Sequence, residues 1–311
     1  MSEGIGASVQ RKEDKKFLTG KGRYTDDINR AGQVYAHFVR SDVAHANIKS
    51  IDTKAASAAS GVVAVYTGED VAADGIGGPI CGWVVPNRDG SATHEPPHPL
   101  LAQGKVRFVG DAVAVVIAES VEQAKSASEL VEVDYEELPA VANLETASSG
   151  AEIHEGMAEN RYFDWELGDE AETDKALKSA AKVVKLTVRN NRLIPNAMEP
   201  RCALAEYDDL ADSYTLHTTS QNPHLTRLVL AAFMFQIPES KLRVVAPDVG
   251  GGFGSKIYVY IEESVCVWAS KKLKRPIKWT ADRTQSFLTD AHGRDHVNNV
   301  QLALDDKNKI I

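Results

Sequence analysis

The sequence holds few residues that could bind a metal directly. Only three cysteines occur in 311 residues, Cys81, Cys202 and Cys266, and no two of them form a CxxC pair. Because iron–sulfur clusters and structural zinc need clustered thiolate or imidazole ligands, neither is expected in this chain. Scattered cysteines in odd number favour buried thiols in a reducing, cytoplasmic compartment over disulfides.

Long apolar runs are missing as well. No run approaches the roughly 20 residues that a membrane-spanning helix needs, and residues 1–16 lack the apolar centre of a secretory signal. The net charge of −9 argues against binding to nucleic acid or to acidic membrane surfaces. With 43% hydrophobic and 25% charged residues, the chain is expected to be a soluble protein, long enough for two domains.

What the sequence does contain is a glycine-rich segment, VGGGFGSK, at residues 249–256. It follows a predicted strand, 242–246, and precedes a predicted helix, 258–272. Glycine tolerates positive φ and lets the backbone approach another group closely. Because free N–H groups at a helix N-terminus suit an anion or a polar cofactor, the pattern predicts a binding loop.

Neither nucleotide-binding motif fits this segment. A dinucleotide fingerprint counted from Gly250 needs glycine where Ser255 stands. A P-loop needs Gly-Lys-Ser/Thr, whereas the chain has Ser255-Lys256-Ile257. A tight turn without a ligand is an alternative, although it needs fewer glycines. Nucleotide binding stays a further hypothesis, which titration with ATP and NAD would test.

The remaining pattern predicts a chain of mixed α/β class. Period-two alternation and short apolar runs indicate strands, and capped segments indicate helices, with Ser120 placed to cap one of them. The expected strands are 33–40, 61–67, 112–118, 130–135, 203–207, 213–219 and 297–304, with a half-buried strand around Val184, Leu186 and Val188; the expected helices are 53–59, 121–129 and 223–235; and 75–99 is expected to be a long loop.

Several segments resemble those of one enzyme family, in the family's order. They are LTGKGRYTDDI at 18–28, VRFVGDAVA at 106–114, VDYEELP at 133–139, MEPR at 198–201, TSQNP at 219–223 and the glycine-rich segment. The chain therefore resembles the molybdenum hydroxylases, the xanthine oxidase family. It looks most similar to their molybdenum-binding large subunits of the aerobic carbon monoxide dehydrogenase type.

The resemblance implies an α/β (α+β) fold in which a hammerhead domain is followed by the first part of a molybdenum-cofactor-binding domain. The expected divisions are a polar tail at 1–15, a self-contained α/β hammerhead domain at 16–140, a linker at 141–165 and a truncated cofactor-binding domain at 166–311. A turn at 305–309 and the start of a returning strand at Ile310-Ile311 close the sequence. The chain is therefore expected to be an N-terminal fragment or one piece of a split protein, inactive alone.

The same resemblance assigns the candidate site. Gln221 is expected to donate a hydrogen bond to an oxygen on molybdenum. The residues expected to contact the metal centre and the pterin are Gly251, Gly252, Phe253 and Gly254. From the residues alone, Gln221 could instead belong to a helix entry capped by Asn222, and the ring of Phe253 could pack in the core.

Nearby charged residues have simpler expected roles. Lys256 is expected to be solvated, although a contact with cofactor phosphates is left open. Glu262 and Glu263 are expected to be helix-surface charges or partners of nearby lysines. His292 and His296 could share a helix face, but a pair of histidines without a third ligand is a poor metal site.

Two further positions bear on the structure of the site and on the substrate. Glu199 is expected either in an exposed turn or buried against Arg201 or Arg192. Ile257 stands where, by resemblance, xanthine-oxidising members carry a glutamate that orients the purine. An aliphatic residue there disfavours purine as a substrate.

The resemblance implies a molybdenum–molybdopterin cofactor in the cytosine dinucleotide form, and oxidative hydroxylation with water as the oxygen source. Iron–sulfur and FAD subunits on separate chains and the remainder of the large subunit would be partners, in a dimer of heterotrimers. No direct metal ligand or catalytic residue is expected, because the family's glutamate base would lie beyond Ile311. Carbon monoxide, aldehydes and N-heteroaromatics stay open as substrates. The alternative is a non-catalytic assembly or docking fragment.

Overall fold

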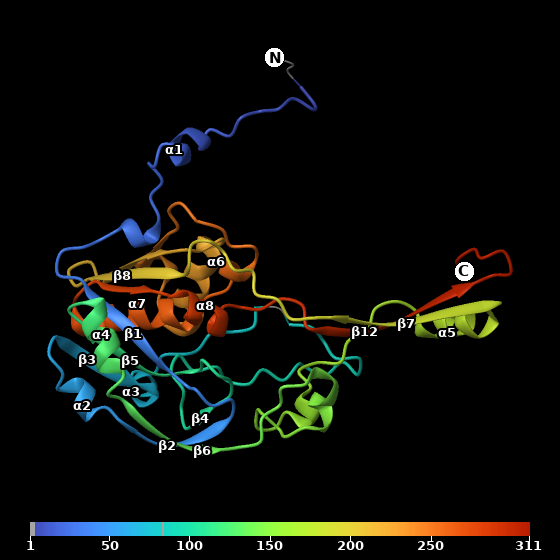
Figure 1. The fold of residues 1–311 in the computed structure, drawn as a ribbon, viewed down its shortest axis with the longest axis horizontal. Helices are drawn as coiled ribbons and strands as arrows, with labels where there is room; N and C mark the ends of the chain where they lie inside the picture. The colour runs from blue at the N-terminus through green and yellow to red at the C-terminus, as the bar shows by residue number, and fades with distance from the viewer. Residues whose placement is uncertain (1–3, 83) are drawn as a thin grey trace.

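The computed structural model describes residues 4–82 and 84–311, and its centre is one mixed sheet of seven strands (Figure 1). Residues 1–3 of the predicted tail and Trp83 of the predicted long loop lie outside the described residues. In spatial order the strands are β10 (Leu242–Val245), β9 (Ser213–Thr218), β8 (Cys202–Asp208), β11 (Ile277–Thr280), β1 (Val34–Arg40), β5 (Ala112–Ala118) and β3 (Val62–Thr67).

This sheet joins the two predicted domains. β1 pairs in parallel with β11, with Val34 opposite Ile277, so strands of the 16–140 part and of the 166–311 part share one sheet. The expectation of a self-contained hammerhead unit was wrong in this respect, because the edge of β1 is completed by the later part of the chain. All seven residues of β5 are buried, as its continuous apolar run predicts.

Smaller elements surround the central sheet. The other strands are β2 (Ala46–Asp52), β4 (Lys105–Val106) and β6 (Glu132–Glu137) in one small sheet, and β7 (Lys182–Asn190) and β12 (His296–Leu304) in another. The α-helices are α1 (Asp14–Leu18), α2 (Lys54–Ser57), α3 (Gly68–Ala73), α4 (Val121–Ser128), α5 (Glu170–Ser179), α6 (Pro223–Leu228), α7 (Ile261–Leu273) and α8 (Arg283–Thr289). The short 3-10 helices are Thr25–Asp27, Leu144–Ser149, Ala158–Asn160, Glu239–Lys241 and Ser255–Ile257, and a π-helix, Val229–Met234, extends α6. Within the described residues, no helix has the length and apolarity to cross a membrane.

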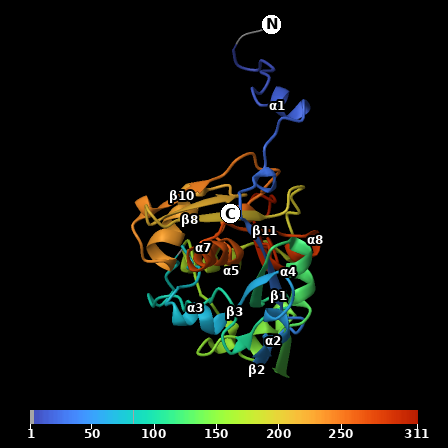
Figure 2. The ribbon, with the colours of Figure 1, turned by 90° about the vertical axis from the view of Figure 1, so that its left-hand side faces the viewer.

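Of the helices that contact the central sheet, α7 packs against β8 and β11 and α4 against β1 and β5 (Figure 2). The Oγ of Ser120 accepts a hydrogen bond from the backbone of Gln123 and caps α4 as predicted. Asn222 caps α6 in the same way through Leu225. Every residue from 262 to 270 in α7 is buried, so this helix forms the centre of the core rather than its cover.

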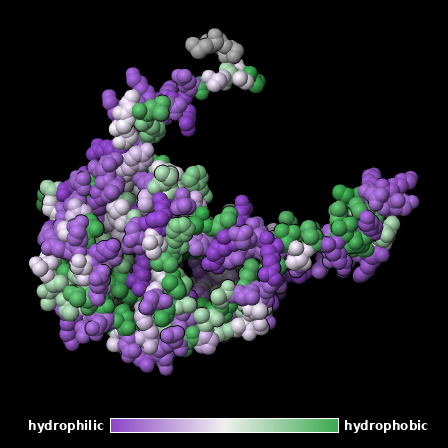
Figure 3. Space-filling model, viewed as in Figure 1, coloured by the Kyte–Doolittle hydropathy of each residue, from purple (hydrophilic) through white to green (hydrophobic). Residues whose placement is uncertain are grey.

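The strands β7 and β12 form an arm that projects from the body together with α5 (Figures 1 and 3). Val184, Leu186 and Val188 are exposed on it, so the expectation of a half-buried strand was wrong. The alternation correctly predicts a strand, but no layer of the described residues covers its apolar face. At the other end of β12 the chain turns back, and Ile310 forms a bridge with Leu304 as the sequence predicts.

The hairpin of β8 and β9 offers a matched test of the core. Leu216 is fully buried in β9, whereas Leu210 in the connecting turn is fully exposed. We expect Leu216→Ala to lower the free energy of unfolding by about 2–5 kcal/mol, because a buried cavity is left, and Leu210→Ala to change it by less than about 0.5 kcal/mol. Denaturant unfolding of both variants measures this. Equal losses would contradict the assigned position of the core.

Candidate functional site

The glycine-rich segment is a loop with an unusual backbone. It connects β10 to a 3-10 turn, Ser255–Ile257, and α7 begins only at Ile261 rather than at the predicted 258. Gly251 (φ +98°), Phe253 (φ +50°) and Gly254 (φ +93°) all have positive φ. Glycine adopts this conformation freely, whereas Phe253 is strained there, which is typical of a loop shaped by its surroundings.

The backbone N–H groups of the loop are hydrogen-bonded at its two ends and not in its middle. The backbone N–H of Gly250 donates to Oε2 of Glu199 over 2.7 Å, and the N–H of Gly254 donates to Oε1 of Gln221 over 2.9 Å. Between them, the N–H groups of Gly251, Gly252 and Phe253 have no hydrogen-bond partner within the part of the chain that the structure describes. Three consecutive unpaired donors, in a loop where Gly251 and Phe253 have positive φ, make a site for an anion or for oxygen atoms.

Gln221 lies against this row of donors. A Cβ atom added at Gly252 would lie 2.4 Å from its Oε1, so glycine is needed there for close approach. The backbone N–H of Gln221 also donates to the carbonyl oxygen of Lys256 over 2.8 Å. Because Gly254 occupies the amide oxygen of Gln221, the side-chain NH₂ is left as a donor beside the loop.

Phe253 presents its ring to solvent. Its side chain is 73% exposed, so the alternative in which the ring packs in the core was wrong. Because this ring is exposed on a strained loop residue, it is available to form one wall of a ligand site.

Glu199 and Lys256 form a buried ion pair under the loop. The Nζ of Lys256 lies 3.1 Å from Oε2 and 2.8 Å from the carbonyl oxygen of Glu199. The side chain of Lys256 is 1% exposed, so the expected solvated lysine was wrong, and Glu199 is paired with Lys256 rather than with Arg201 or Arg192. Burial lowers the pKa of Lys256, although the Glu199 carboxylate acts in the opposite direction.

A second buried network lies next to this pair. Arg201, 1% exposed, contacts Glu262 (2.7 Å) and Asp290 (2.5 Å), and its guanidinium lies 3.7 Å from the ring centroid of Tyr260. Arg40 reaches Glu262 from β1 over 2.7 Å. Burial opposes ionisation of Glu262, but the two arginines outweigh it and lower its pKa to about 2.

Glu263, the neighbour of Glu262, is also buried but has no arginine partner among the described residues. Since both are buried, and their partners are arginines for Glu262 and Thr218 for Glu263, the expectation of helix-surface charges or of partners for nearby lysines was wrong. Its Oε1 accepts a hydrogen bond from Thr218 over 2.7 Å, and its Oε2 has no partner within the described residues. Burial, reinforced by Glu262, raises the pKa of Glu263 to about 7.

The histidines singled out in the sequence do not come together as a metal pair. His296 begins β12, whereas a ring nitrogen of His292 lies 3.0 Å from the carbonyl oxygen of Phe287. They therefore do not share a helix face. No group of three metal-ligating side chains occurs among the residues that the structure describes.

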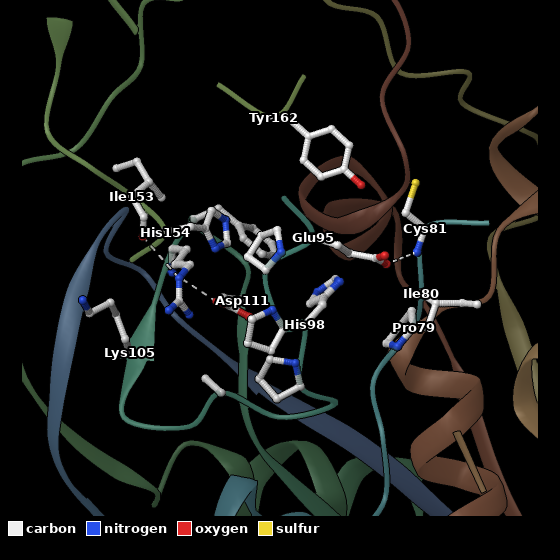
Figure 4. A pocket seen from close by; sticks show the side chains of 16 residues that line it. Pro79, Ile80, Cys81, Glu95, His98, Lys105, Asp111, Ile153, His154 and Tyr162 are labelled. Carbon is white, nitrogen blue, oxygen red and sulfur yellow. Dashed lines mark hydrogen bonds between the residues drawn. The ribbon is translucent and has the colours of Figure 1, made fainter. Parts of the chain in front are cut away.

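A separate cavity of about 460 Å³ lies between the 79–99 loop and the 153–162 segment (Figure 4). Figure 4 shows the side chains of His98, Asp111 and His154 around it. Burial raises the pKa of Asp111. Burial lowers the pKa of His154, and the nearby positive charge of Arg107 lowers it further. None of the five residues assigned to the site by resemblance lines this cavity, so it is distinct from the glycine loop.

Comparison with known proteins decides the family. Residues 19–139 match the family described as "Aldehyde oxidase and xanthine dehydrogenase, a/b hammerhead domain", and residues 153–311 match "Molybdopterin cofactor-binding domain". The chain belongs to the molybdenum hydroxylase family. The fold class expected from the sequence, a hammerhead domain followed by a cofactor-binding domain, is confirmed.

The similar molybdenum hydroxylases are much longer. The nicotine 6-hydroxylase large subunit of Paenarthrobacter nicotinovorans is 35% identical over 98% of this chain and 37% of its own length. The carbon monoxide dehydrogenase large chain of Afipia carboxidovorans is 36% identical over 99% of this chain and 38% of its own length. The structure of quinoline 2-oxidoreductase from Pseudomonas putida 86 matches with a TM-score of 0.87 and 37% identity, over 99% of this chain and 38% of that one.

The loop of this family member fits a molybdopterin-type group. Three unpaired N–H donors and the NH₂ of Gln221 suit oxygen atoms of a ligand. The buried Oε1 of Glu199 has no partner within the described residues and suits an N–H donor, of which a pterin ring has several. The unpaired donors of the loop and of Gln221 therefore lie beside an acceptor of Glu199, and no direct metal ligand occurs among these residues.

The buried Glu263 makes the stability of this domain depend on pH. Its folded-state pKa is raised from 4.5 to about 7, so its stabilising contribution is complete below pH 4.5 and is lost as pH rises to about 7. As the pH rises from 4.5 to 8, the parent chain loses this contribution and Glu263→Gln does not. We therefore expect the free energy of unfolding of Glu263→Gln, relative to that of the parent chain, to increase by about 1–3 kcal/mol over this range. Urea unfolding at both pH values measures this, with the exposed Glu122→Gln as control. A difference that does not change with pH would contradict the assignment.

Proposed function

We propose that this chain supplies the cofactor-contacting loop of a molybdenum hydroxylase large subunit. The observation that carries the proposal is the row of unpaired N–H groups at Gly251, Gly252 and Phe253, with the oriented NH₂ of Gln221 beside it. Catalysis by a bound cofactor leaves to the protein the tasks of orientation and electrostatic stabilisation. A row of fixed donors, with an amide that is a donor at any pH, suits those tasks.

When bound, the molybdenum–molybdopterin cofactor would supply the redox chemistry of hydroxylation with water as the oxygen source. Gln221 and the unpaired amides of Gly252 and Phe253 would hold its oxygen atoms, and Gly254 would contact it beside them. Gly251 would let the backbone approach it, and the exposed ring of Phe253 would limit the space beside it. The cytosine dinucleotide form of the cofactor belongs to the proposal.

The substrate that we propose is small and not a purine. Ile257, which is 39% exposed, has no hydrogen-bonding group to orient a purine. Relatives of this chain are named for nicotine and for carbon monoxide, and a structural neighbour is named for quinoline. Carbon monoxide, aldehydes and N-heteroaromatics are the candidates.

The proposal also includes the partners. Electrons would leave through an iron–sulfur subunit and an FAD subunit on separate chains, in a cytoplasmic dimer of heterotrimers. The catalytic glutamate would come from the part of a large subunit that lies outside this sequence, since the chain spans somewhat over a third of the length of its relatives.

Substitution of Gln221 in the complete enzyme tests this function. We expect Gln221→Ala to lower kcat about 10²–10³-fold, as loss of one preorganised donor does elsewhere. Gln221→Glu keeps the size of the side chain but replaces the NH₂ donor by an acceptor, so it should lower kcat by a similar factor. The measurement is the rate of molybdenum-centre reduction by substrate, alongside molybdenum content.

The exposed Gln10→Ala is the matched control and should leave both quantities unchanged. Gly252→Ala gives a second route to the same effect, because its Cβ would displace the Gln221 side chain. Unchanged reduction rates in Gln221→Ala and Gln221→Glu would remove the cofactor-contact role.

A further inference from the structure

We propose that Lys256 and Glu199 are positioning residues whose ion pair sets the shape of the glycine loop. They hold its two ends together so that the N–H groups between them stay unpaired. The identity of the ligand rests on the function proposed above, whereas the shape of the loop is a property of this chain alone.

The geometry closes the loop into a ring. Glu199 makes two bonds to Gly250 at the start of the loop: its N–H donates to the carbonyl oxygen of Gly250 over 3.1 Å, and its Oε2 accepts from the N–H of Gly250. Lys256, at the end of the loop, returns to Glu199 through two hydrogen bonds of its own. Both ends of the loop therefore meet at a single residue.

A second ring shares Lys256. Its carbonyl oxygen accepts from the backbone of Gln221, whose side-chain oxygen accepts from Gly254. A shift of Lys256 would therefore move Gln221 as well as the loop. The packing is tight at the other end too, because a Cβ added at Gly250 would lie 2.5 Å from the Cβ of Glu199.

Stability alone does not account for this pair. A buried ion pair is often no more stabilising than apolar residues of similar size, because both charges lose their hydration. The Lys256 side chain is 1% exposed and that of Glu199 13% exposed, so this cost applies here. What the pair does provide is a connection between the two ends of the loop, since the ammonium binds the carbonyl oxygen and the carboxylate of Glu199, and the same carboxylate accepts from Gly250.

The experiment separates geometry from stability by hydrogen exchange of the chain without cofactor. In Lys256→Met we expect the protected amides of Gly250 and Ser255 to exchange at least about tenfold faster. The double variant Glu199→Leu/Lys256→Met removes both buried charges. Its melting temperature should return to within a few degrees of the parent value, while fast exchange at the Ser255 amide persists. A purely structural role predicts that restored stability also restores slow exchange at Ser255, because the acceptor of its N–H, the carbonyl oxygen of Gly252, is present in every variant.

Lys272→Met is the control, because Lys272 forms a comparable but half-exposed pair with Asp74 and should leave the loop unchanged. Slow exchange at Ser255 in a folded double variant would overturn the proposal. Failure of both Lys256 variants to fold would overturn it too, because the pair would then be a general stability element. Since exchange is measured without cofactor, absence of molybdenum binding would count against the proposed function and not against this inference.

Discussion

The cofactor-binding part of this chain is organised by the need to pair charges that the fold buries. Arg201, Glu262, Glu199 and Lys256 lie almost wholly out of water, and an unpaired ion there would be costly. Arg40 extends the pairing to β1, which connects the hammerhead strands to α7. The segment around Glu199 is thereby fixed to the core on one side and to the glycine loop on the other.

These anchored residues determine which hydrogen-bonding groups the glycine loop presents. Its ends are tied to Glu199 and Gln221, and its middle keeps three backbone donors unpaired. A flexible glycine segment would satisfy such donors by folding on itself or by binding water. Held from both sides, it instead keeps them in place before any ligand arrives, which reduces the entropic cost of binding.

Local patterns in the sequence predict local structure well. The apolar run of β5, the cap at Ser120 and the glycine loop all follow from neighbouring residues. The buried charges do not, because their partners are distant: Arg201 lies 61 positions from Glu262, and Lys256 lies 57 from Glu199. Charged residues at a helix start are usually on the surface of the protein. Glu262 and Glu263 are buried instead because the central sheet packs on α7. The open face of β7 was missed for a similar reason, since alternation does not show what covers a strand.

The most direct test of the account is the molybdenum content of this protein, purified from its source together with the chains that accompany it. Elemental mass spectrometry gives the ratio of metal to chain. The account predicts a ratio near one, with iron–sulfur and flavin subunits in the same complex. A complex that contains those subunits and an intact glycine loop, but no molybdenum, would contradict it.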